Sequence, residues 1–71
     1  MTKLQEMRKT VGLTQAELAE KAGLKISVLR QYEIGFRSIN NAAAIAVWRL
    51  AQVLECSIED IFEPEEKRDE S

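Results

Sequence analysis

The sequence predicts an all-α protein of five short helices, and two observations lead to this prediction. Apolar residues recur at spacings of three and four positions, which is the period of a helix with one buried face. No segment shows the sustained apolar and polar alternation with hairpin-type turn dipeptides that marks a β-sheet. With 71 residues, 45% of them hydrophobic and 31% charged, the chain has the size and composition of one small folded domain.

The first three predicted helices are short, and each is followed by a glycine. They run from Thr2 to about Val11, from Gln15 to Ala22, and from Ile26 to about Ile34, and the glycines are Gly12, Gly23 and Gly35. The apolar stripe of the first helix is expected to consist of Leu4, Met7 and Val11. Thr2 and Gln5 have the spacing of an N-cap residue and its partner at the start of the first helix, and Thr14 and Glu17 repeat this signal as a capping box at the start of the second.

Two further helices are expected in the second half of the chain. The longer one runs from Asn41 to about Leu54, is rich in alanine, and can be capped by Asn40 or Asn41. The last helix is short: Ser57 is its expected N-cap, acidic residues fill its first turn, and it ends near Pro64.

Charge is unevenly distributed along the chain, although the net charge is only −2. Residues 1–49 contain eight basic and four acidic residues, whereas residues 50–71 contain two basic and eight acidic ones. The first part of the chain can therefore approach an anionic partner despite the acidic total. Residues 64–71 are expected to form an acidic, disordered tail, to which we assign no function.

Several classes of function are excluded by what the chain lacks. There is no histidine, and Cys56 is the only cysteine, so we expect no disulfide, no metal site, no cofactor and no enzyme. No apolar stretch is long enough for a membrane span or a signal peptide, which predicts a cytoplasmic protein without a membrane partner. We infer no small-molecule ligand, and we interpret Trp48 and Cys56 as core or interface residues.

Residues 15–35 have the spacing of two helices that cross at a tight turn. Such a crossing needs a small inward residue in the first helix and a glycine in the turn, and Ala19 and Gly23 meet these requirements. The inward apolar positions are then Leu18, Ala22, Leu24, Leu29 and Tyr32. The outer face of the second of these two helices carries Lys25, Ile26, Ser27, Arg30 and Gln31, and a DNA-binding protein keeps its contacts on such a face.

From about Leu4 to Phe62, the chain resembles the helix-turn-helix domains of phage repressors and Cro proteins and the wider Xre family of bacterial regulators. It is also similar to small Gram-positive regulators of this type. The resemblance is carried by Arg8, Gly12-Leu13-Thr14-Gln15, Glu17-Leu18-Ala19, Gly23, Leu29, Tyr32-Glu33, Gly35, Leu50-Ala51, Leu54 and Ile58. It implies a compact five-helix bundle of the lambda-repressor-like DNA-binding type over residues 1–63, in which the second and third helices form the helix-turn-helix.

The resemblance also implies a function. The chain would be a transcriptional regulator, expected to act as a repressor, that binds a pseudo-palindromic double-stranded DNA operator as a homodimer in a bacterial or phage-encoded, nucleoid-associated setting. The implied base-contacting residues are Lys25, Ile26, Ser27, Arg30 and Gln31. Of these, Lys25 and Arg30 can reach either guanine or phosphate. The implied phosphate-contacting residues are Thr14, Gln15, Phe36 and Arg37, and Arg8 and Glu33 match a salt-bridged pair of the family.

Some positions depart from the family pattern. Lys25-Ile26 stands where the family has a capping serine or threonine followed by a polar residue, which implies weaker or T-rich base reading, and Glu55 replaces the usual glycine after the fourth helix.

Two interaction surfaces are also expected. The fourth and fifth helices, with Trp48 and Ile61, form the candidate dimer surface. The alternative function is a protein-interaction module of the same fold, an antitoxin or an adaptor with weak or no specific DNA binding. Its apolar patch would consist of Ile26, Val28, Ile34 and Phe36.

Overall fold

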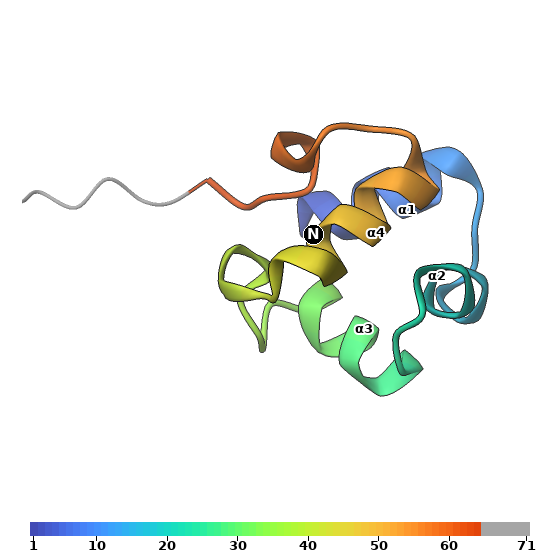
Figure 1. Cartoon of the computed structure of the whole chain (residues 1–71), viewed down its shortest axis with the longest axis horizontal. Coiled ribbons are helices and arrows are strands. Elements are labelled where there is room, and N and C mark those ends of the chain that lie inside the picture. The colour runs from blue at the N-terminus through green and yellow to red at the C-terminus, as the bar shows by residue number, and fades with distance from the viewer. Residues whose placement is uncertain (65–71) are drawn as a thin grey trace, which may run out of the picture.

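Four α-helices follow one another in the computed structural model, which describes residues 1–64 (Figure 1). They are α1 (Lys3–Val11), α2 (Gln15–Ala22), α3 (Ile26–Glu33) and α4 (Ala44–Leu54), with two single 3-10 turns, η1 (Ile39–Asn41) and η2 (Ile58–Asp60). These residues contain no strand, so the all-α prediction is confirmed, whereas the predicted number of five helices is wrong. Most of the expected acidic tail, residues 65–71, lies outside the described residues.

The ends of α1 and α2 follow the predicted capping pattern. The Gln5 amide donates to the Thr2 hydroxyl at 3.2 Å, and the Glu17 amide donates to the Thr14 hydroxyl at 3.1 Å. The Thr14 amide donates back to the Glu17 carboxylate at 2.9 Å, which completes the capping box. This backbone hydrogen bond, with a second one from the Thr14 side chain, lowers the pKa of Glu17. The chain therefore leaves α1 and enters α2 through a short, hydrogen-bonded connection.

The fourth helix begins later than predicted, at Ala44 instead of Asn41. Neither asparagine caps it: its N-cap is Ala43, whose side chain makes no capping hydrogen bond. Asn41 belongs to η1, and the Asn40 side chain is used elsewhere, since its amide donates to the Glu63 carbonyl at 2.8 Å and its oxygen accepts from the Glu63 amide at 3.0 Å. A contact across 23 residues of sequence thus overrides the local capping preference.

The predicted fifth helix is only the 3-10 turn η2. Its expected N-cap region does form, because the Ser57 amide donates to the Asp60 carboxylate at 3.0 Å. The turn cannot continue, because Asn40 takes both main-chain polar groups of Glu63 and because Pro64 disfavours the helical conformation of the residue before it. Within residues 61–64 no helix therefore follows η2, although a second helical turn was expected there.

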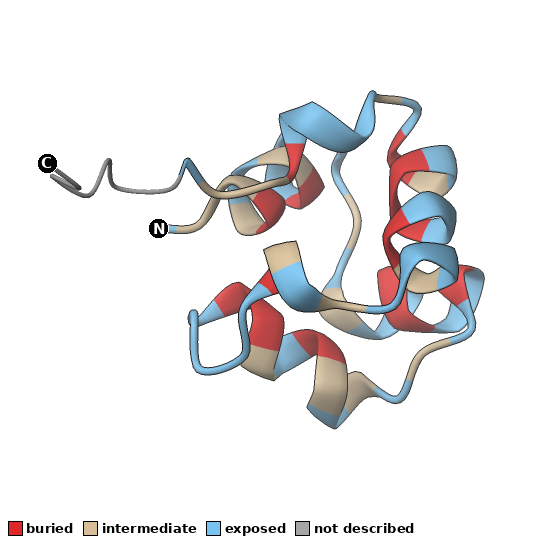
Figure 2. Ribbon diagram, turned by 60° about the vertical axis from the view of Figure 1, so that its left-hand side comes forward, coloured by how far each residue is buried: buried red, intermediate tan, exposed pale blue. Residues whose placement is uncertain are grey.

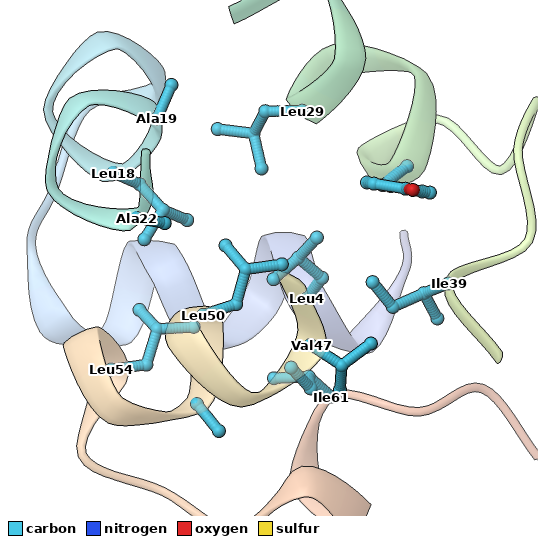
Figure 3. Close-up of a cluster of buried hydrophobic side chains, with 12 residues drawn as sticks. Leu4, Leu18, Ala19, Ala22, Leu29, Ile39, Val47, Leu50, Leu54 and Ile61 are labelled. Atoms are coloured by element: carbon cyan, nitrogen blue, oxygen red, sulfur yellow. The ribbon is translucent and has the colours of Figure 1, made fainter. Parts of the chain in front are cut away.

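The core lies where the inner faces of all four helices meet, as Figure 3 shows for the side chains of Leu4, Leu18, Leu29 and Leu50. Apolar side chains from α1, α2, α3, η1, α4 and the residue after η2 make up this core: Leu4, Leu18, Ala19, Ala22, Leu29, Tyr32, Ile39, Val47, Leu50, Ala51, Leu54 and Ile61. Burial of these side chains is the main favourable contribution to folding. The buried positions form stripes on the helices, and the opposite faces are exposed (Figure 2).

Two apolar residues, Val11 and Ile61, lie differently from their predicted positions, and Trp48, predicted as a core or interface residue, is exposed. Val11 is exposed, so the inner face of α1 is formed by Leu4, the half-buried Met7 and the buried Arg8. Trp48 and Ile45 lie on the exposed face of α4 at 51% and 54% exposure, so Trp48 does not belong to the core. Ile61 is fully buried, so it cannot belong to a dimer surface. Among residues 1–64, no helix is long and apolar enough to cross a lipid bilayer.

Candidate nucleic-acid interface

The exposed face of α3 is the centre of the candidate interface. Leu29, Tyr32 and Glu33 anchor the inner side of this helix in the core. Lys25, which precedes α3 and makes no side-chain cap, is exposed, as are Ser27 and Arg30 on the outer side. A helix of eight residues thus presents a row of polar side chains to solvent, a shape that fits a groove of duplex DNA.

The predicted base-contacting residues are not equally exposed. Ile26 is half-buried and packs against the core, so only part of its side chain can reach a partner. Gln31 is also half-buried, and its side-chain oxygen accepts a hydrogen bond from Arg37 Nε. The structure therefore brings all five predicted residues to one helix face or its edge, with Lys25, Ser27 and Arg30 the most accessible of them.

An ion pair between Arg8 and Glu33 links α1 to α3 beneath this face. Arg8 Nε donates to Glu33 Oε2 at 2.6 Å, and Arg8 Nη2 donates to Glu33 Oε1 at 3.1 Å. The side chains are 10% and 0% exposed, so the predicted salt bridge is present and is buried. Arg8 Nη1 also donates to the Leu13 carbonyl at 2.8 Å, and the Thr2 hydroxyl donates to the Glu33 carbonyl at 2.8 Å. These bonds fix the orientation of α3 on the rest of the molecule.

Gln15, a predicted phosphate-contacting residue, connects this ion pair to the surface. Its Nε2 donates to Glu33 Oε1 at 2.9 Å, and its Oε1 accepts from Arg30 Nε at 3.3 Å. Gln15 is the first residue of α2 and is half-buried, and Thr14 beside it is exposed. The sequence did not predict the contact between Gln15 and Arg30, because the two residues are 15 positions apart and no local pattern joins them.

The loop after α3 carries the other two predicted phosphate-contacting residues. Phe36 is 77% exposed, and Arg37 is exposed as well. The loop is held against α3, because the Arg37 amide donates to the Gln31 carbonyl at 3.1 Å and the two side chains are hydrogen-bonded. A shallow open groove beside it is lined by Tyr32, Arg37, Ser38, Asn41 and Ala42. Arg37 therefore combines an accessible positive charge with a fixed main chain.

Cys56 has the properties of a packing residue. It is half-buried against the core, and burial together with the nearby Asp60 carboxylate raises the pKa of its thiol. A raised pKa lowers the fraction of thiolate, which is the reactive form. Within residues 1–64, no three acidic or cysteine side chains lie close enough together to hold a metal ion.

Comparison with known proteins identifies the fold. The helix-turn-helix family model matches residues 4–61, which is most of the chain. The restriction-modification controller protein C.AhdI from Aeromonas hydrophila has a similar structure, with a TM-score of 0.74 and 32% sequence identity over 84% of this chain and 86% of that chain. The N-terminal DNA-binding domain of SinR from Bacillus subtilis is similar as well, with a TM-score of 0.74 and 26% identity over 90% of both chains.

No curated protein sequence matches the chain significantly. The family match nevertheless includes α2, α3 and α4 entirely and all but the first residue of α1. The chain belongs to the helix-turn-helix family, as a DNA-binding domain of the phage repressor and Cro type found in Xre regulators.

Proposed function

We propose that this protein is a sequence-specific, double-stranded DNA-binding regulator that represses transcription and that does no catalysis. The observation that carries the proposal is the solvent-exposed polar face of α3, which the buried pair of Arg8 and Glu33 holds in place. The proposal is supported by the family to which the chain belongs and by the DNA-binding domain of SinR.

In this proposal α3 lies in the major groove and reads base edges. Gln31 pairs with adenine, Ile26 contacts a thymine methyl group, and Ser27 and Lys25 donate to neighbouring bases. Ile26 is half-buried, so its contact area is small, which agrees with weak apolar readout at that position. Arg30 lies on the same face.

Phosphate contacts flank the base-reading residues on two sides. Thr14 and Gln15 lie at the start of α2, where the helix dipole favours an anion, and Gln15 contributes its main-chain amide because its side-chain NH₂ group donates to Glu33. On the other side, Arg37 contributes charge and Phe36 contributes its main-chain amide, since an aromatic ring offers no donor to a phosphate. These contacts position α3 but carry no sequence information.

The regulator acts as a homodimer on a pseudo-palindromic operator, because one recognition helix covers only a few base pairs. Its contact surface is the outer face of α4, where Ile45 and Trp48 lie three residues apart and are both about half exposed. Sedimentation at micromolar concentration tests this assignment. Wild type and the control variant Val11→Ala are expected to be dimers, whereas Trp48→Ala is expected to be a monomer. A wild-type monomer would contradict the proposed dimer.

Selection of binders from a pool of random DNA duplexes tests the regulator function, at about 100 mM salt because phosphate contacts still contribute strongly there. Wild type is expected to enrich a palindromic motif. Gln31→Ala is expected to lose preference at one position of each half-site, and Thr10→Ala, a change of an exposed polar residue on α1, is expected to keep the wild-type motif. Absence of any enriched motif with wild type would refute the proposed function.

One observation favours a second function, a protein-interaction module. Ile34 and Phe36 are 73% and 77% exposed and lie close together at the end of α3. Large exposed apolar side chains are typical of protein contacts. Salt distinguishes the two functions: DNA binding is expected to weaken steeply between about 50 and 200 mM, whereas an apolar protein contact would change little.

A further inference from the structure

Arg30 lies at the edge of the exposed face of α3, on the side that faces α2. It follows Ile26 by one helical turn and precedes the buried Glu33 by three residues, so it lies between the exposed and the buried sides of the helix. Its Nε donates to Gln15 Oε1 at 3.3 Å. The two helices are packed against each other (Figure 1), and this bond directs the guanidinium toward the first residue of α2.

The side chain of Gln15 is itself held by the buried Glu33, so its contact with Arg30 has a defined orientation. Its Nε2 donates to Glu33 Oε1, the same oxygen that accepts from Arg8 Nη2, and Glu33 is fully buried. Because an ionised carboxylate only accepts hydrogen bonds, Glu33 requires the NH₂ group of Gln15 to face inward. The amide oxygen then faces outward, where only a donor such as Arg30 can use it. Hydrogen bonds thus link Arg8 on α1 to Glu33 on α3, Glu33 to Gln15 on α2, and Gln15 to Arg30 on α3.

We propose that Arg30 binds a phosphate of the DNA backbone and does not read a base. This inference rests on the proposed function and assigns a role within the same interface. With Nε used by Gln15, the guanidinium keeps its two NH₂ groups free to form the paired hydrogen bonds that suit a phosphate. The hydrogen bond to Gln15 holds the guanidinium near Thr14, which the proposed function also gives as a phosphate-contacting residue.

The two arginines then flank the base-reading residues. Arg30 is tied to Gln15 on one side, and Arg37 is hydrogen-bonded to Gln31 on the other. Ser27 precedes Arg30 by three residues and Gln31 by four, so it lies between them one turn earlier on the helix. Base reading within α3 is left to Ile26, Ser27 and Gln31, and the two arginines set the depth of the helix in the groove.

The test compares operator and random duplex over a range of salt concentrations, with wild type, Arg30→Ala and Arg30→Lys. Arg30→Ala is expected to weaken binding to both duplexes by the same factor, about five- to tenfold at 100 mM salt. The slope of log K against log salt is expected to fall by about 0.9, which corresponds to one lost phosphate contact. Arg30→Lys is expected to keep most of that slope because it keeps the charge. Lys9→Ala, which removes an exposed positive charge on α1, is the control and is expected to leave the slope unchanged.

A double-mutant cycle of DNA affinity tests whether Gln15 positions Arg30. If Gln15 positions Arg30, the losses of affinity in Gln15→Ala and Arg30→Ala are expected to be non-additive. The inference is overturned if Arg30→Ala changes the motif selected from the random pool at one position while the salt slope stays the same. In that case the proposed function stands. If wild type fails to bind any duplex at about 50 mM salt, the proposed function fails, and this inference fails with it.

Discussion

The buried pair of Arg8 and Glu33 is the single-residue feature with the largest expected effect on stability. In Arg8→Ala, the Glu33 carboxylate would remain buried without its charged partner and with only Gln15 as a side-chain donor. Removal of one partner from a buried ion pair typically costs about 3–5 kcal/mol, whereas an exposed pair contributes about 0–1 kcal/mol. We therefore expect Arg8→Ala to lower the free energy of unfolding by about 3–5 kcal/mol, measured by thermal unfolding followed by circular dichroism.

Since a domain of this size is rarely stabilised by more than about 3–5 kcal/mol, Arg8→Ala is expected to be largely unfolded. Arg8→Lys is the companion variant: it keeps the charge but not the paired geometry, and it is expected to fold with a reduced midpoint. Lys9→Ala, at the exposed neighbouring position, is expected to change stability by less than about 0.5 kcal/mol. An unchanged midpoint in Arg8→Ala would refute the structural role of the pair.

At the scale of single elements, the C-terminal end of α4 contains a conformational cost that a substitution can remove. Glu55 adopts a left-handed conformation with φ of +55°, and it is the only non-glycine residue among those described that has a positive φ. This conformation costs an L-residue roughly 1–2 kcal/mol, and a carboxylate at a helix C-terminus is also unfavourable. Glu55→Gly is expected to stabilise the protein by about 1 kcal/mol, after the greater freedom of glycine in the unfolded chain is counted, as measured by urea denaturation.

The matched control is Gly12→Ala at the end of α1. An added Cβ at Gly12 would meet no atom within 4 Å, so the variant isolates the backbone cost at a φ of +92°. It is expected to lose about 1 kcal/mol. Destabilisation by Glu55→Gly would mean that the Glu55 side chain contributes more than its backbone conformation costs.

Helix ends could be predicted from the sequence where the signal is local. Thr2 and Thr14 cap α1 and α2, and Gly12 and Gly23 follow these helices in left-handed conformations, as their positions predicted. The start of α4 could not be predicted, because Asn40 contacts Glu63, far away in the sequence. The left-handed end of α4 forms without a glycine because tertiary packing of the helix offsets its cost.

At the scale of the whole molecule, sequence reasoning could identify the exposed face of α3 but could not predict the contacts that its side chains make with α2. Periodicity separates the inner face of α3 from its outer face, so Ser27 and Arg30 could be predicted as exposed. The pairing of Gln15 with Arg30 depends on how α2 and α3 cross, which local spacing does not determine. The same reason explains the wrong assignment of Ile61, whose burial requires the chain after α4 to turn back toward α1.

The segment after η2 is held against the rest of the domain by hydrogen bonds of Asn40 and Lys3 with Glu63. Ile61 closes the core, and Glu63 is bound on two sides: its main chain by the Asn40 side chain, and its carboxylate by the Lys3 amide at 2.6 Å. Asn40→Ala removes two hydrogen bonds and leaves the Glu63 main chain without its protein partner. Since each such bond contributes about 0.5–1.5 kcal/mol, the variant is expected to lose about 1–3 kcal/mol.

Hydrogen exchange followed by NMR distinguishes local from global effects of Asn40→Ala. The Glu63 amide is expected to lose its protection completely, whereas amides in the middle of α4 are expected to exchange faster only by the loss in global stability. Asn41→Ala, a change at the exposed neighbouring position in η1, is expected to leave the Glu63 amide protected. Equal protection of the Glu63 amide from exchange in wild type and in Asn40→Ala would contradict the proposed role of the Asn40 hydrogen bonds. The segment after η2 would then be held by burial of Ile61 alone, and the start of α4 at Ala44 would need another explanation.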